Sequence, residues 1–181
     1  MKKTNTGYGV RAITLAAMLI AMSVVIGIFC KSVLNFGGGL FRITFENFPI
    51  IISGILFGPI VGGAVGLGSD IISYLLSGQA YPPNIIVSVG ATLVGVISGV
   101  VAKFIVRKRG TAQVIFAGGA AHLVGSMIVK PIGLFAFYQW AVLWRIPLYL
   151  VIAPLEILII ALLFKNATFC RLTADIGKKE N

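Results

Sequence analysis

Residues 84–106 read NIIVSVGATLVGVISGVVAKFIV, and this stretch decides the class of fold. It contains one charged residue, Lys103, and a helix of this length can cross the roughly 30 Å hydrocarbon core of a bilayer. Its apolar residues are continuous, whereas the strands of a membrane barrel alternate apolar and polar residues. The stretch therefore predicts a transmembrane helix.

The whole chain has the same apolar character. Of its 181 residues, 58% are hydrophobic and 11% are charged, and the mean hydropathy is +1.01. Soluble domains carry about 25% charged residues, and a chain this short has too little interior to hide so much apolar surface. We expect an all-α membrane protein in which residues 1–181 form a single transmembrane domain, because helices pair their own backbone groups in lipid.

Six apolar segments are expected to form helices with both chain termini on one side. They cover residues 10–31, 48–57, 60–76, 84–106, 112–137 and 146–164. The second segment is only about 15 Å long as a helix, so the glycine-rich loop before it is expected to fold into the protein. Gly58-Pro59 predicts a turn, Lys130-Pro131 predicts an interruption of the fifth helix, and residues 165–181 read as a polar, basic tail.

Basic residues are distributed unevenly between the two sides of this predicted bundle. Eleven fall on the side of the termini: Lys2, Lys3, Arg11, Lys103, Arg107, Lys108, Arg109, Lys165, Arg171, Lys178 and Lys179. The other four, Lys31, Arg42, Lys130 and Arg145, fall on the opposite side. By the positive-inside rule both termini are cytoplasmic. The net charge of +10 then reports membrane topology, and no nucleic-acid partner is expected.

Catalytic patterns are missing from the sequence. It has one histidine, no HExxH motif, no Walker lysine and no paired carboxylate motif. The only cysteines, Cys30 and Cys170, are expected on opposite sides of the membrane. We expect no enzyme activity, no metal site and no cofactor, so any energised transport has to draw on an ATPase partner.

Polar and aromatic residues gather in the loops expected on the outer side. Cations beside membrane spans are costly and usually face a cavity, so Arg42, Lys130 and Arg145 suggest capture of a carboxylate or phosphate. Tyrosine and tryptophan rings can stack on a flat heterocycle, although an interfacial aromatic belt with snorkelling cations is an alternative for any one residue. The candidate binding residues are Arg42, Glu46, Asp70, Tyr74, Tyr81, Asn84, Lys130, Tyr138, Trp144 and Arg145.

Two carboxylates lie inside predicted helices and need partners. Asp70 has the chemistry to bind the ring N–H and amino groups of a pterin or pyrimidine, but pairing with Arg42 or capping of the broken loop are structural alternatives. Glu156 is expected to pair with His122 or Lys103, in a structural role.

The first helix carries small residues at four-residue spacing. Ala12 and Ala16 form one such pair, and Ala17 and Ala21 form another. This spacing lets another helix approach closely, although alanine is common in membrane helices and such pairs recur by chance.

Four stretches carry a family resemblance: AMLIA at 17–21, FRITFENFP at 41–49, LFGPIVGG at 56–63 and GLGSDII at 66–72. With them the chain resembles the substrate-binding (S) subunits of energy-coupling factor (ECF) vitamin transporters, over nearly its whole length. Together with AYPP at 80–83, they look most like the folate-specific subunits of that superfamily.

The resemblance implies the S-component fold in the cell membrane, with a vitamin bound from outside in a pocket closed by external loops. It implies docking, through Ala17 and Ala21, on a module of one transmembrane coupling subunit and two ATP-binding subunits. For folate, Asp70 or Asn84 would contact the pterin, while Arg42, Lys130 or Arg145 would hold the glutamate tail. Alternatives are pantothenate or a hydroxymethylpyrimidine-type thiamine precursor and, from other classes, an autonomous channel or a membrane enzyme.

Overall fold

The computed structural model describes residues 10–36, 41–77 and 84–174. The regular secondary structure of these residues is helical apart from one short antiparallel ladder. The α-helices are α1 (Val10–Val33), α2 (Asn47–Phe57), α3 (Pro59–Leu76), α4 (Ile85–Val100), α5 (Thr111–Ala121), α6 (Lys130–Tyr138), α7 (Arg145–Lys165) and α8 (Ala167–Ala174). The remaining elements are the strands β1 (Asn35–Phe36) and β2 (Phe41–Arg42), the π-helices η1 (Val101–Ile105) and η2 (His122–Val129), and the 3₁₀ helix η3 (Gln139–Trp144).

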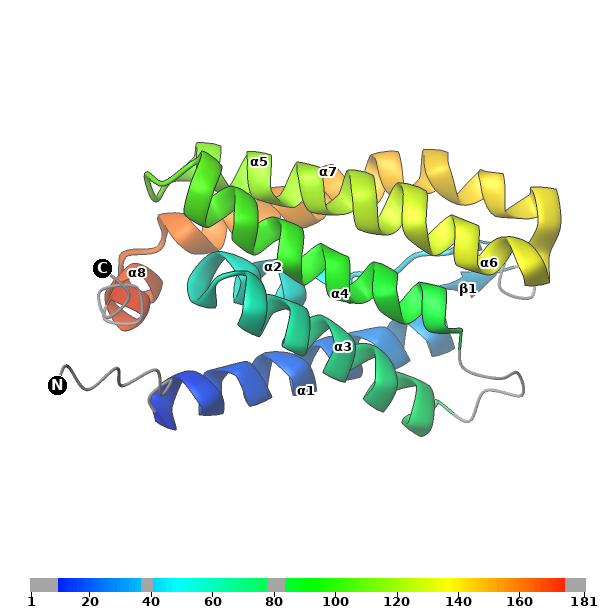
Figure 1. The fold of residues 1–181 in the computed structure, drawn as a ribbon, viewed down its shortest axis with the longest axis horizontal. Helices are drawn as coiled ribbons and strands as arrows, with labels where there is room; N and C mark the ends of the chain where they lie inside the picture. Colours follow the sequence, from blue (N-terminus) through cyan, green and yellow to red (C-terminus); the bar gives the residue numbers. More distant parts are fainter. Residues whose placement is uncertain (1–9, 37–40, 78–83, 175–181) are drawn as a thin grey trace, which may run out of the picture.

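Five helical segments of the described chain are long and apolar enough to cross a membrane. They are Ala12–Val33, Pro59–Leu76, Ile85–Ile105, Thr111–Phe135 and Ile146–Lys165. They run lengthwise along the bundle (Figure 1), and large apolar side chains such as Ile13, Phe29 and Leu150 are exposed on its surface. Such a surface suits lipid better than water.

Helix α2 is the exception, because it is short and lies inside the bundle. Its 11 residues rise about 16 Å, too little to span a bilayer alone. All of them except Phe48 are buried, and α2 packs against α1, α3, α4, α5 and α7. Thr44 is also buried, so the chain enters the protein before α2 begins, as the short length of α2 predicts.

Glycines allow the helices around α2 to approach one another closely. A Cβ on Gly95 of α4 would overlap the carbonyl group of Gly62 on α3, and one on Gly54 of α2 would overlap Ser98. Gly58 has a φ of 85° and makes the turn from α2 into α3, where Pro59 occupies the first helical turn. The predicted turn at Gly58-Pro59 is therefore confirmed.

The fifth predicted helix continues through Lys130-Pro131 rather than breaking there. Pro131 has no N–H to donate to the preceding turn. The segment before it, η2, has the wider π-helical hydrogen bonding, and the N–H of Lys130 donates to the Gly125 carbonyl. The helix therefore changes its hydrogen-bond pattern in place of an interruption.

Three short elements, β1, β2 and α8, were not predicted from the sequence. Strands β1 and β2 pair antiparallel, Asn35 opposite Arg42 and Phe36 opposite Phe41, in a segment expected to be an irregular loop. Residues 167–174, within the segment interpreted only as a polar, basic tail, form the helix α8. Asn166 starts this helix, because its Oδ1 accepts the N–H of Thr168 at 2.9 Å.

We predict that Gly95→Ala destabilises the protein by about 1–3 kcal/mol or more. The added methyl group would overlap the backbone of α3, and a backbone cannot move aside as a side chain can. Thermal unfolding in detergent measures this. Gly119→Ala is the matched control, because its Cβ meets no atom within 4 Å, and it should be neutral or mildly stabilising. Equal melting temperatures for the two variants would show that the close approach of α4 to α3 at Gly95 does not require glycine.

Candidate functional site

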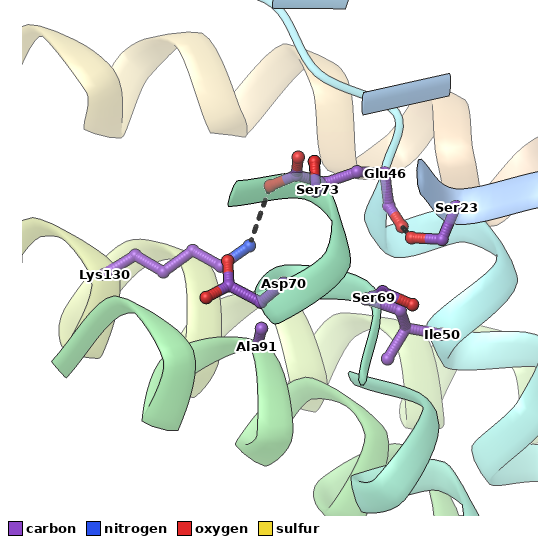
Figure 2. Close-up of a pocket in the computed structure, with 8 residues that line it drawn as sticks. All are labelled: Ser23, Glu46, Ile50, Ser69, Asp70, Ser73, Ala91 and Lys130. Carbon is purple, nitrogen blue, oxygen red and sulfur yellow. Dashed lines mark hydrogen bonds and ion pairs between the residues drawn. The ribbon is translucent and has the colours of Figure 1, made fainter. Parts of the chain in front are cut away.

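A pocket lies among α1, α2, α3, α4 and α6, towards the end of the bundle that carries β1 and α6 (Figures 1 and 2). The empty space between its atoms is about 230 Å³, including the part open to solvent. Six of its lining residues are polar, Ser23, Glu46, Ser69, Asp70, Ser73 and Lys130, and the apolar Ile50 and Ala91 complete the lining. Three of the candidate binding residues, Glu46, Asp70 and Lys130, therefore come together from separate parts of the sequence.

Lys130 is the buried cation of this pocket, with only 5% of the residue exposed. Its Nζ lies 2.9 Å from Asn47 Oδ1 and 3.3 Å from Glu46 Oε1. An ammonium group removed from water needs such partners, because its desolvation is costly. The start of α2 supplies both of them.

Glu46 joins the pocket to α1. Its backbone carbonyl accepts a hydrogen bond from the hydroxyl of Ser23 at 2.7 Å. Its side chain does not cap α2 but lies in the pocket, where a Cβ on Gly27 of α1 would come within 3.2 Å of Oε2. The residue before α2 is thus fixed from two sides.

Asn47 and Gly90 complete the setting of Lys130. The Asn47 side chain is fully buried and donates to Ser126 Oγ at 3.3 Å while accepting from Lys130. A Cβ on Gly90 of α4 would lie 2.7 Å from Lys130 Cγ, so the lysine stem occupies space that only glycine leaves open.

Asp70 provides the second carboxylate of the pocket. It is half-buried on α3, and its Oδ2 accepts a hydrogen bond from Ser88 Oγ of α4 at 2.6 Å. Within the described residues it forms no ion pair, in contrast to Glu46. Figure 2 shows its carboxylate beside the Lys130 side chain, whose hydrogen bonds go to Glu46 and Asn47.

Asn84 has a structural role that was not predicted from the sequence. Its Oδ1 accepts the N–H groups of Ile86 at 3.0 Å and Val87 at 3.4 Å, which caps the start of α4. Its Nδ2 donates to the carbonyl of Gly133 on α6. Both ends of this amide are engaged, and Asn84 is not among the residues that line the pocket.

Two further polar residues lie near the pocket. Tyr74 is half-buried on α3, one turn beyond Asp70. Lys31 of α1 donates to Ser73 Oγ at 3.1 Å and to Ser77 Oγ at 3.2 Å, which ties α1 to α3 beside the lining residue Ser73.

Other candidates are located only by their backbone or fall outside the described residues. Arg42 lies in β2, Tyr138 ends α6, Trp144 ends η3 and Arg145 begins α7. The side chains of these four residues, and all of Tyr81, lie outside what the structure describes.

His122 and Glu156 form a second polar pair deep in the bundle, apart from the pocket lining. His122 Nε2 lies 2.8 Å from Glu156 Oε2, and both side chains are at most 1% exposed. This confirms His122 as the expected partner of Glu156 and joins η2 to α7. No cluster of three or more potential metal ligands occurs in the described part of the chain.

Comparison with known proteins places this architecture in a family. The model of the family described as "ECF transporter, substrate-specific component" matches residues 11–176. The chain belongs to this family of S components. They are membrane subunits of vitamin transporters that bind the substrate, so the family is one of transport proteins.

Two individual relatives show how far the likeness extends. A solved structure described as FolT bound with folic acid superposes on this S component with a TM-score of 0.67, at 22% identity, covering 88% of this chain and 96% of that one. The "Uncharacterized protein MG098 homolog" of Mycoplasma pneumoniae is 33% identical over 114 residues. The match covers 58% of the S component and 23% of the length of that relative.

The small-residue pairs of α1 face in different directions. Ala12 and Ala16 are partly buried against the hydrophobic core of the S component. Ala17 and Ala21 are exposed, on the same helix face as Met18 and Val25. Only the second pair is therefore available to another helix.

Sequence reasoning did not identify the serines of the pocket. Ser69 and Ser73 line it, and Ser73 and Ser77 bind Lys31. The serines recur every four residues around Asp70, which places them on one helix face. This four-residue spacing of serines in an otherwise apolar helix could have indicated from the sequence that they share a polar face.

We predict that Lys130→Met lowers stability by about 3 kcal/mol, because it leaves the Glu46 carboxylate without its ammonium partner. Adding Glu46→Gln to Lys130→Met should restore part of the loss. Thermal unfolding of the two single variants and the double variant measures the coupling. If the losses of stability of the two single variants simply add in the double variant, Lys130 and Glu46 do not stabilise each other.

Proposed function

We propose that this S component captures a folate-type vitamin outside the cell and delivers it through an ATP-driven ECF module. The observation that carries the proposal is the fold shared with a protein solved with folic acid, over 88% of this chain. The polar pocket supports it, because it offers hydrogen-bonding groups deep in an apolar bundle.

Asp70 is the residue we assign to the pterin ring. The 2-amino-4-oxo ring of a pterin presents a ring N–H and an amino group side by side, and a carboxylate can accept both. Asp70 suits this role because, among the described residues, it has one hydroxyl partner and no ion pair. Glu46 is less suited, since Lys130 already holds it.

Arg42 and Arg145 are the residues we assign to the carboxylates of the glutamate tail. They belong to β2 and to the first residue of α7, two elements that lie in contact. Lys130 is a weaker candidate, because both Glu46 and Asn47 occupy its ammonium. Tyr74, Tyr81, Tyr138 and Trp144 remain candidates for stacking on the rings.

The alternative cargoes differ in how they suit Asp70. Pantothenate carries a carboxylate and no heterocyclic donor edge, so it offers this residue little. A hydroxymethylpyrimidine-type precursor has an aromatic amino group and is the closer competitor. We favour folate because Asp70 matches the donor edge of a pterin and the fold is shared with a protein solved with folic acid.

We also propose six membrane passes, with α2 as the short second pass, both termini in the cytoplasm and the pocket facing outside. Described basic residues support this orientation, because Arg107, Lys108 and Arg109 lie at the end of the bundle opposite the pocket. The pocket would then open to the side from which a nutrient arrives.

The proposed partners are one transmembrane coupling subunit and two ATP-binding subunits, docked at Ala17 and Ala21. The exposure of this alanine pair supports the assignment. An autonomous channel is the alternative from another class. It would conduct when reconstituted alone, whereas an S component binds its vitamin alone and needs the module for uptake.

We predict that the purified protein retains folate, identified by mass spectrometry of the released ligand. Asp70→Asn should weaken folate binding by about 10-fold to 100-fold, because a charge-assisted hydrogen bond contributes about 1.5–3 kcal/mol. Lys165→Gln, an exposed charge at the other end of the bundle, should bind normally. Recovery of pantothenate or a pyrimidine alcohol without folate would refute the choice of cargo.

We predict that Ala17→Trp with Ala21→Trp abolishes assembly with the ECF module and leaves vitamin binding within about twofold. The bulky rings block close approach of a partner helix, but they point away from the pocket. Copurification with the module and calorimetry of the isolated subunit measure the two effects. Ala112→Trp, at another exposed alanine, is the control and should assemble normally.

A further inference from the structure

Charge is distributed very unevenly along this bundle. Seven Lys and Arg side chains are described, and Lys31 and Lys130 bind partners around the pocket. The other five are exposed and lie in or beside η1, the α4–α5 connection and the end of α7: Lys103, Arg107, Lys108, Arg109 and Lys165. We call the last four of these, Arg107, Lys108, Arg109 and Lys165, the basic end.

The basic end has no acidic counterpart in the described residues. The three described carboxylates are elsewhere: Glu46 and Asp70 line the pocket, and Glu156 pairs with His122 inside the bundle. The charge of the basic end is therefore not balanced by carboxylates of the described chain, and it attracts an anionic partner.

Helix α8 gives the basic end a defined surface. It is seen end-on in Figure 1, so it runs across the end of the lengthwise helices. Phe169 packs edge-on against Phe164 of α7 with ring centroids 5.2 Å apart, and Arg109 donates to the carbonyl of Thr173 at 3.4 Å. These contacts hold α8 against both α7 and the α4–α5 connection.

The surface changes from apolar to basic within a few residues. Phe104 is 58% exposed and Ile105 is 69% exposed on η1, and Arg107 and Lys108 follow directly. Apolar side chains that face lipid, followed at once by exposed cations, mark the depth at which the phosphates of a bilayer lie. Both the charge and its position match a phospholipid surface.

We propose that the basic end is a binding site for the phosphate headgroups of anionic phospholipids, with Arg107, Lys108 and Lys165 as the contacting cations. Arg109 acts mainly through α8, which it holds in place. The site lies at the other end of the molecule from the pocket. It depends neither on the identity of the vitamin nor on which leaflet the basic end faces.

The test uses the full-length protein in nanodiscs of phosphatidylcholine with a minor fraction of phosphatidylglycerol. Native mass spectrometry of the protein released into mild detergent gives the ratio of the two lipids retained. The wild type should retain phosphatidylglycerol in excess of its share of the bilayer, and high salt should reduce the excess.

Arg107→Gln with Lys108→Gln should reduce this preference by about 25-fold, at roughly fivefold per cation. Arg107→Lys is the charge-preserving control and should retain the preference. Both variants should bind the vitamin as the wild type does, since neither residue lies near the pocket.

Three outcomes would overturn the proposal. One is equal retention of both lipids by the wild type. A second is displacement of the retained lipid by millimolar inorganic phosphate, which would indicate a site for the free ion. The third is a double variant that keeps its lipid preference but no longer assembles with the ECF module, which would make the basic end a protein-docking surface.

Discussion

The buried ammonium group of Lys130 is the interaction on which the arrangement of the pocket depends. An unpaired cation in an apolar bundle is unstable, so Glu46 and Asn47 have to lie beside it. That requirement brings the start of α2 deep into the protein. Through Ser23 and Ser126 the same residues also fix α1 and η2. One charge thus orders α1, the start of α2 and the continuous helix formed by η2 and α6, which lie far apart in the sequence.

Close helix packing makes this polar centre possible. Glycines at the crossings of α2, α3 and α4 let backbones approach to distances that any side chain would prevent, and Gly90 leaves room for the Lys130 stem. Helix α2 can then be short, because protein rather than lipid surrounds it. The pocket and the exposed Ala17 and Ala21 belong to separate faces, so ligand capture and partner docking can be altered independently. The basic end adds a third surface, at the membrane boundary.

Much of the candidate site was predictable, but with uneven detail. Asp70 and Lys130 stood out because charges are rare in apolar spans, Glu46 was one of the polar residues of the outer loops, and all three line the pocket. Their partners were not predictable, since Lys130 and Glu46 are 84 residues apart. Asn84 illustrates the limit: its residue type suits a ligand or a helix cap equally well, and only its hydrogen bonds assign it to the cap. The pocket serines were missed because serine is also common in helix packing.

The sequence by itself determined that the protein lies in a membrane, which long segments form helices and that the chain turns at Gly58. Hydropathy, segment length and backbone freedom are local properties, so no long-range contact is needed to infer them. The sequence also determined where the spans end, since Lys and Arg cannot lie unpaired in hydrocarbon. Tertiary structure alone decided that α2 lies in the centre, that Ala17 and Ala21 face outward while Ala12 and Ala16 face inward, and that Glu46 rather than Asp70 pairs with Lys130. These outcomes depend on which helices meet, and that is set by long-range packing and by the pairing of buried charges.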